Sequence, residues 1–227
     1  MEETIKIFIY IHAFFGGLGL ITGLGSIIVK KGSKPHKKMG KLFSIGMIIS
    51  SLISMPISWL PNHENIFLFL IGLFTIYLVI SGNQILTFKS KNKKFAKPID
   101  KIISGIMLAL SILMILFGVY GLIERNSTYL LFVFFGGFGL SLTIRDFIFY
   151  KKFKKTKNGW ISNHIGKMIG AFIASITAFI VAGLGIENLI AWTLPSILGT
   201  IYIVYWRRKL KIKTVANKGN RCTSSKK

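Results

Sequence analysis

Cysteine and acidic residues are scarce in this chain of 227 residues, which has 7 Asp and Glu against 30 Lys and Arg. The only cysteine, Cys222, lies in the C-terminal tail, so one chain can form neither an internal disulfide nor a metal site built from several thiolates. The N-terminal residues lack the basic segment and small-residue cleavage site of a signal peptide. We therefore expect the first apolar segment to stay in the protein as a membrane anchor.

Common catalytic signatures are absent as well. The sequence contains no Gly-Lys-Thr or Gly-Lys-Ser phosphate loop, no His-Glu-x-x-His zinc helix and no Gly-x-Ser-x-Gly nucleophile elbow. A soluble catalytic domain has no room beside the long apolar segments. Enzymatic activity is therefore the less expected interpretation.

Long apolar segments are abundant, since 52% of the residues are hydrophobic and only 16% are charged. Seven segments can cross a hydrocarbon core of about 30 Å at about 1.5 Å per residue. They cover residues 7–29, 42–60, 66–88, 102–123, 129–150, 165–185 and 189–206. The predicted fold is all-α, a seven-transmembrane-helix bundle over residues 1–209. Residues 210–227 are basic and rich in Ser, Thr and Asn, which predicts a disordered cytoplasmic tail.

Lysine and arginine mark one set of gaps between the segments. All but three of the 30 follow the first, third, fifth or seventh segment or stand just inside the sixth. This pattern predicts an outer N-terminus and a cytoplasmic C-terminus. The basic loops should contact anionic inner-leaflet lipids, whereas no nucleic-acid partner is expected, because the charge forms no continuous face. Abundant Lys, Ile, Phe and Asn indicate an AT-rich bacterial genome and hence the bacterial inner membrane.

Parts of the chain resemble each other in a fixed order. Residues 14–20 and 134–140 both read Phe-Phe-Gly-Gly-x-Gly-Leu, and loosely matching turns and a shared Thr-Ile-Tyr follow in both halves. These matches predict a duplication in which residues 5–88 and 128–208 are parallel three-helix repeats and residues 101–124 form a connecting helix. A shared composition rich in glycine and phenylalanine is the alternative explanation.

Ionisable side chains inside the segments are the first candidates for function, because they are costly in hydrocarbon. His12 lies on the small-residue face of the first segment and either bonds to a neighbouring helix or contributes to a site. Asp146 lies on an inward face of the fifth segment and needs a partner. Lys167 and His164, at the inner end of the sixth segment, have a suitable depth for that role.

Three further polar residues lie near the inner ends of segments. Asn83 and Gln84 either line a cavity or bond to a neighbouring helix. Arg145 can extend to the interface, which is its more expected position. The candidate ligand-binding residues are therefore His12, Asn83, Gln84, Arg145 and Asp146.

Two histidines open the second and sixth segments at corresponding points. His36 and His164 could bind a metal, a haem iron or an anionic head group. The alternative is that His36, beside Pro35, is an interfacial residue at the start of a helix. No cofactor is firmly implied, and haem is the one that this pair makes conceivable.

The turn His36-Lys-x-x-Gly40 after an apolar helix resembles a family of uncharacterised bacterial multi-pass membrane proteins, defined as a domain of unknown function. The segment from His164 to Thr177 extends this resemblance over most of the chain, and it implies no activity. In topology, three plus one plus three helices are similar to the SWEET and Pro-Gln-loop transporters, although no Pro-Gln dipeptide occurs here. A microbial rhodopsin is excluded, because the seventh segment has no lysine for retinal.

Three functions follow as expectations. The leading one is transport or binding of a small solute between two three-helix repeats. The alternative is a membrane b-type haem or quinone redox protein with histidine ligands. A regulatory or assembly factor whose basic loops dock a partner or lipid is the third.

Overall fold

The computed structural model describes residues 2–60, 64–90, 93, 95–156, 158–186 and 188–224, with side chains described except at residues 2, 4 and 211–224. Every regular element in this part of the chain is helical, which confirms the all-α prediction. The seven long helices are α1 (Glu2–Ile28), α2 (Lys34–Ile57), α3 (Ile66–Gln84), α4 (Pro98–Ile123), α5 (Leu130–Lys152), α6 (Gly159–Ala178) and α7 (Leu189–Ser224). Short helical segments adjoin four of them, namely η1 (Ile85–Lys89), η2 (Ser127–Tyr129), η3 (Phe153–Lys155) and η4 (Phe179–Gly183).

All seven long helices are apolar enough to cross a membrane, as the sequence predicts. The candidate spans, three of which include the adjoining short helices, are between 22 and 29 residues long, which is sufficient for a hydrocarbon core of about 30 Å. The protein is therefore an integral, multi-pass membrane protein.

The helices α2 and α7 extend furthest beyond the segments predicted for them. α2 starts at Lys34 because Ser33 accepts a hydrogen bond from the His36 N–H, and Pro35 occupies a first-turn position that needs no amide donor. α7 continues to Ser224, so residues 210–224 are helical where the sequence predicts disorder. Lys, Arg and Leu favour helix, and no proline follows Pro195. Residues 225–227 lie outside the described residues.

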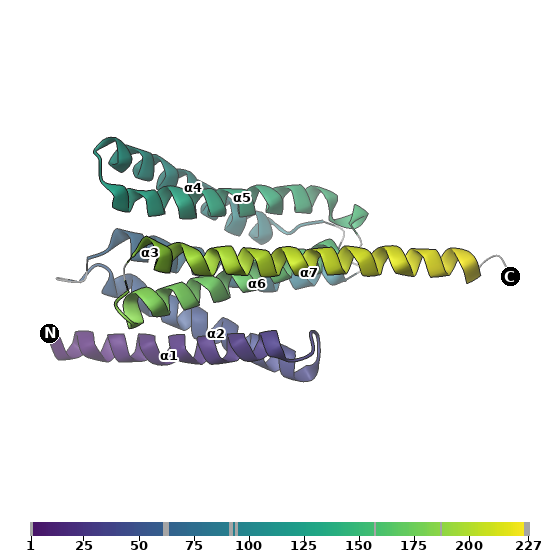
Figure 1. Ribbon diagram of the computed structural model, residues 1–227, viewed down its shortest axis with the longest axis horizontal. Coiled ribbons are helices and arrows are strands. Elements are labelled where there is room, and N and C mark those ends of the chain that lie inside the picture. Colours follow the sequence, from purple (N-terminus) through teal and green to yellow (C-terminus); the bar gives the residue numbers. More distant parts are fainter. Residues whose placement is uncertain are drawn as a thin grey trace.

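Two tight helix hairpins flank a central group of helices. α1 packs along α2 and α4 packs along α5, while α3 and α6 lie between these hairpins and α7 packs on α6 (Figure 1). Glycines permit the close approach within each hairpin. A Cβ on Gly46 would lie 2.8 Å from the Phe15 carbonyl oxygen, and one on Gly136 would lie 3.0 Å from the Ser111 carbonyl oxygen. The central helices α3 and α6 therefore connect the two hairpins.

The helix packing gives the predicted duplication no support. Gly16 and Gly19 face α2, the helix that follows α1. Gly136 and Gly139 instead face α4, the helix that precedes α5. Two equivalent three-helix repeats would pack α5 on α6. Since α4 is the main packing partner of α5 and more than a connector, the duplication stays a prediction.

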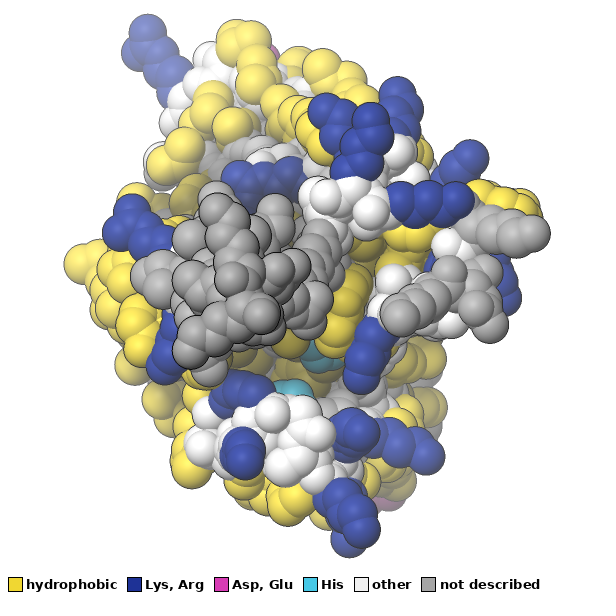
Figure 2. Space-filling model, turned by 90° about the vertical axis from the view of Figure 1, so that its right-hand side faces the viewer, with side chains coloured by type: hydrophobic (Ala, Val, Ile, Leu, Met, Phe, Trp, Pro, Cys, Tyr) yellow, Lys and Arg dark blue, Asp and Glu magenta, His cyan; other side chains and the backbone are white. Residues whose placement is uncertain are grey.

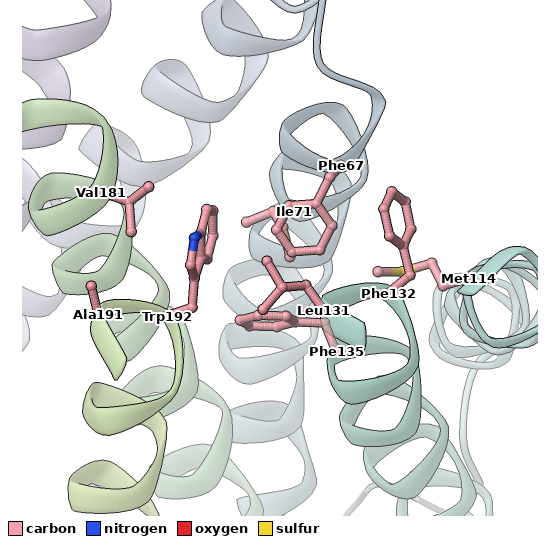
Figure 3. Packing of buried hydrophobic residues seen from close by; sticks show 9 residues of the cluster. All are labelled: Phe67, Ile71, Met114, Leu131, Phe132, Phe135, Val181, Ala191 and Trp192. Carbon is pink, nitrogen blue, oxygen red and sulfur yellow. The ribbon is translucent and has the colours of Figure 1, made fainter. Parts of the chain in front are cut away.

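An aromatic cluster closes the bundle at the end where α3, α5 and α7 begin. The ring of Phe67 lies 5.0 Å from Phe132, 5.6 Å from Phe135 and 5.1 Å from Trp192, measured between centroids (Figure 3). All three pairs have the edge-to-face geometry that favours aromatic contact. A second apolar cluster around Leu78 fills the middle of the bundle.

The opposite end of the bundle carries most of the described lysines. It is formed by the segments that join α1 to α2, α3 to α4 and α5 to α6, and we call it the lysine-rich end. Figure 2 looks onto this end and shows Lys and Arg side chains around a hollow in which histidine side chains are visible. The polar groups that could carry function lie in and beneath this hollow.

Candidate functional site

A fully buried ion pair lies between α5 and α6. Lys167 Nζ donates a hydrogen bond to Asp146 Oδ2 at 2.5 Å, and the two residues are 2% and 1% exposed. The sequence analysis named Lys167 and His164 as possible partners of Asp146 from their depth, and in the structure Lys167 is the one that contacts it. Removing either charge would leave the other unpaired in the interior, which makes the pair interdependent.

Two hydroxyl groups complete the surroundings of the Asp146 carboxylate. Tyr77 from α3 and Ser104 from α4 each donate to Oδ2 at 2.8 Å. Lys167 Nζ also lies 4.9 Å from the centroid of the Tyr77 ring, within the range of a cation–π contact. Four helices thus contribute one group each, so this cluster ties α3, α4, α5 and α6 together. We call it the Asp146 cluster.

A line of polar groups leads from the Asp146 cluster toward the lysine-rich end. The Ser104 and Tyr150 hydroxyl oxygens are 3.0 Å apart, and Tyr150 donates to the Asp100 carbonyl oxygen at 3.2 Å. The Asp100 carboxylate accepts from Lys93 Nζ at 3.1 Å and from the Lys97 N–H at 2.9 Å, which caps the first turn of α4. The buried carboxylate is therefore connected to the end of the bundle.

Sequence reasoning missed most of these hydroxyls. Tyr77, Ser104 and Tyr150 occur among apolar residues, where tyrosine and serine are ordinary packing residues. Asp100 was also missed, although an acidic residue in the first turn of a helix that starts at Pro98 is a readable capping signal.

Both carboxylates have one oxygen without a partner. Within the described residues, Asp146 Oδ1 and Asp100 Oδ1 are buried and accept no hydrogen bond. In Asp146 all three donors converge on Oδ2. Oδ1 can thus accept a proton without displacing any of them.

A cavity of about 580 Å³ opens at the lysine-rich end between α1, α2, α3, α6 and α7, and we call it the chamber. Its walls contain both candidate histidines, His36 and His164, together with Asn83. Deeper in the cavity, Phe43 of α2 meets Phe172 of α6 with a centroid distance of 6.3 Å. These rings lie about two helical turns beyond the histidines. The cavity is therefore a cleft with polar groups at its mouth and aromatic groups at its floor.

Backbone carbonyls fix the two imidazoles in the same way. His36 Nδ1 lies 3.0 Å from the Ser26 carbonyl oxygen, and His164 Nδ1 lies 2.8 Å from the Gly82 carbonyl oxygen. A carbonyl oxygen can only accept, so Nδ1 carries the proton in both rings. Among the described residues no group bonds to either Nε2. In the neutral ring each Nε2 therefore keeps a lone pair available to a ligand.

Cations and indole rings surround the mouth of the cavity. Lys31 Nζ lies 5.8 Å from the centroid of Trp206, and Lys89 Nζ lies 5.7 Å from that of Trp160. Lys31 also donates to the Ser26 and Ile27 carbonyl oxygens at the end of α1. Burial lowers the pKa of Lys31 below the ordinary value of 10.5. Positive charge is therefore concentrated at the mouth of a chamber whose walls are mainly apolar.

A second, apolar cavity of about 480 Å³ lies between α1, α6 and α7. Its lining includes Ile173, Leu194 and Pro195. Phe172 lines both cavities. Ile27, Ile169 and Tyr202 line both cavities as well, so four side chains separate the polar-mouthed chamber from the apolar groove along α6 and α7.

Three of the candidates from the sequence, His12, Arg145 and Gln84, do not line either cavity. His12 is half-buried, and its Nδ1 lies 2.9 Å from the Ser50 carbonyl oxygen, so it joins α1 to α2. Arg145 is exposed, as its expected interfacial position requires, and Gln84 is half-buried. Asn83 does line the chamber, where its amide donates to Ser44 Oγ at 2.9 Å. The structure thus brings together His36, His164 and Asn83, with Asp146 deeper in the bundle.

A metal site with three or more His, Cys, Asp or Glu ligands has no basis in the part of the chain that the structure describes. Among the described residues, no three His, Cys, Asp or Glu side chains converge on one position. Of the described His, Cys, Asp and Glu side chains, His36 and His164 are the two that line the chamber. No family model, curated protein or solved structure matches this chain, so the functional argument depends on the site itself.

Proposed function

We propose that the protein binds an amphipathic anion, a molecule with an anionic head and an apolar body, in the chamber between His36 and His164. The observation that carries this proposal is the combination in one chamber of lysines at the mouth, two imidazoles held by backbone carbonyls and an aromatic floor. Lysines and imidazoles attract and bond to an anionic head, while the apolar walls favour the body of the ligand.

The second cavity supports a ligand with an extended apolar chain. It is lined almost entirely by apolar side chains and adjoins the chamber at Phe172. A chain that passes Phe172 would lie along α6 and α7 while its head stays near the histidines. Transport of such a solute is the activity that suits this arrangement. The proposed binding region is bounded by α1, α2, α3, α6 and α7, and it differs from the axis between two repeats that the sequence suggested.

The charge distribution supports an orientation for this activity. Lysine and arginine gather at the end where the chamber opens, which by the positive-inside rule faces the cytoplasm, with the N-terminus outside. In a bacterial inner membrane the same lysines would meet anionic lipid head groups. The chamber therefore takes its ligand from the cytoplasmic face or the inner leaflet.

Tryptophan quenching tests the binding proposal. In protein carrying Trp59→Phe and Trp192→Phe, Trp160 and Trp206 at the chamber mouth are the remaining tryptophans. Dodecyl phosphate brominated on its chain should quench them saturably in nanodiscs of zwitterionic lipid, and a brominated dodecyl trimethylammonium should not. Equal, non-saturable quenching by both would mean simple partition into lipid and would overturn the proposal.

Paired charge variants locate the binding site. Lys31→Gln with Lys89→Gln removes two charges at the mouth and should weaken binding of dodecyl phosphate. Lys151→Gln with Lys152→Gln removes the same charge from exposed lysines of α5 that do not line the chamber, and should leave binding nearly unchanged. Equal weakening by both pairs would indicate attraction to the whole lysine-rich end only.

A b-type haem protein is the second candidate, and the histidine pair favours it. His36 and His164 lie on different helices, are within electrostatic range of each other and both offer Nε2 as a ligand. Protein purified from haem-replete cells should then show a Soret band. The band should disappear in His36→Ala and in His164→Ala and persist in His12→Ala, because His12 lies outside the chamber. A colourless protein rules this candidate out.

A further inference from the structure

The Asp146 cluster has no part in binding at the chamber, yet it places two charges in the interior of a membrane protein. Such charges are costly in hydrocarbon and usually mark a pathway for ions or protons. The cluster lies on the side of the lysine-rich end, and the apolar clusters around Leu78 and Phe67 separate it from the opposite end. Any exchange with water is therefore directed to one face.

The geometry of the carboxylate suits reversible protonation. Lys167 from α6, Tyr77 from α3 and Ser104 from α4 all bond to Oδ2, and Oδ1 accepts nothing within the described residues. A proton on Oδ1 neutralises Asp146 without breaking these bonds. The cation of Lys167 then keeps its contact with the Tyr77 ring.

Hydroxyl groups connect this carboxylate to the lysine-rich end. Ser104 Oγ lies 2.8 Å from Asp146 Oδ2 and 3.0 Å from the Tyr150 hydroxyl, and Tyr150 is only half-buried. The line ends in the first turn of α4, where Asp100 meets Lys93. The groups that face the carboxylate from the packed helices are thus two hydroxyls from α3 and α4 and one ammonium from α6, with Tyr150 and Asp100 behind them.

We propose that Asp146 and Lys167 form a proton-exchange site that is served from the lysine-rich end through the hydroxyls of Tyr150 and Ser104. The Tyr150 hydroxyl first turns from the Asp100 carbonyl oxygen toward Ser104 Oγ. Ser104 then passes its proton to Asp146 Oδ2 and takes the Tyr150 proton, and Tyr150 takes a proton from a hydronium ion in the water at the bundle end. Each hydroxyl ends with the proton count with which it began. A half-turn of the carboxyl group then moves the protonated oxygen to the position that no donor contacts, and the other oxygen takes its place among the three donors.

Infrared difference spectroscopy of the full-length protein in nanodiscs tests for the site. With only 7 acidic residues the carboxyl region has few contributors. Lowering the pH should produce the C=O band of a protonated carboxyl that is absent in Asp146→Asn and retained in Asp100→Asn. Asp146→Glu serves if Asp146→Asn fails to fold, and it should move the band. A spectrum that is identical in wild type and in the Asp146 variants would overturn the site.

Deuterium exchange of the same band tests the path. Tyr150→Phe keeps the ring that stacks on Phe88 at 5.8 Å and removes only the hydroxyl. It should slow exchange about 100-fold, the lower value for a positioned proton-transfer group. Tyr205→Phe, which removes an exposed hydroxyl of α7, should leave the rate unchanged. Equal rates in the two variants would overturn the path. Because neither experiment uses a chamber ligand, failure of the binding proposal would not affect either result.

Discussion

Replacing Lys167 with methionine isolates the energetic role of the buried ion pair. The change keeps an unbranched side chain of similar length and removes the ammonium that lies 2.5 Å from Asp146 Oδ2. The carboxylate would then be left 1% exposed without a cation. Removal of one partner from a buried pair typically lowers the free energy of unfolding by about 3–5 kcal/mol.

The structure places the expected loss near the lower limit of that range, at about 3 kcal/mol. Tyr77 and Ser104 still donate to the carboxylate, and hydrogen bonds to charged groups contribute about 1.5–3 kcal/mol each. In the double variant Asp146→Asn, Lys167→Met the amide oxygen still accepts from both hydroxyls, so its stability should lie within about 1 kcal/mol of wild type.

Unfolding in mixed micelles, followed by tryptophan fluorescence, measures these differences. Trp192 lies in the aromatic cluster and reports on the packed bundle. Lys101→Met, which removes an exposed lysine of α4, is the matched control and should change stability by no more than about 0.5 kcal/mol. If Lys167→Met and Lys101→Met have the same effect, or if the double variant is as unstable as the single one, the ion pair does not act as described.

Three further predictions concern the chamber and its neighbours. Gly82→Ala would put a Cβ 3.0 Å from Met168 Sδ at the crossing of α3 and α6 and should lower the free energy of unfolding by about 1–3 kcal/mol. Its control is Gly137→Ala, where an added Cβ would have no atom within 4 Å, and its stability should stay within about 1 kcal/mol of wild type. Unfolding in mixed micelles measures both variants. Phe172→Ala should join the two cavities, at a cost of about 3 kcal/mol, and raise the affinity for longer alkyl phosphates in the quenching assay. Dodecyl phosphate binding should weaken as the pH rises through the lowered pKa of Lys31, below 10.5, because the ammonium loses its charge, and Lys31→Gln should lack that step.

Features with a local cause were predictable from the sequence. Hydropathy runs depend only on neighbouring residues, and all seven spans were located from them. Helix periodicity placed Asp146 on an inward face, and depth alone then selected Lys167 and His164 as possible partners. The choice between those two depends on the position of α6 relative to α5, which no local pattern contains.

Features set by contact between distant helices were not predictable. His12 carries the same chemistry as His36, but it lies against the Ser50 carbonyl oxygen and joins two helices, while His36 lines the chamber. Matching glycine segments at residues 14–20 and 134–140 suggested equivalent surroundings, yet they face different neighbours along the chain. Nearly identical local sequences therefore allow close packing in both places without determining which helix is the packing partner.

The chamber and the Asp146 cluster come close to each other at the crossing of α3 and α6, where Gly82 lies. The Gly82 carbonyl accepts from His164, and Lys167 Cβ is 3.1 Å from where a Cβ of this glycine would stand. His164 and Lys167 are three residues apart and so share one side of α6. In a close-packed interior, a movement of α6 that accommodates a ligand at His164 also moves Lys167 relative to Asp146. Linkage then requires that any effect of anion binding on proton affinity is matched by an equal effect of protonation on anion affinity.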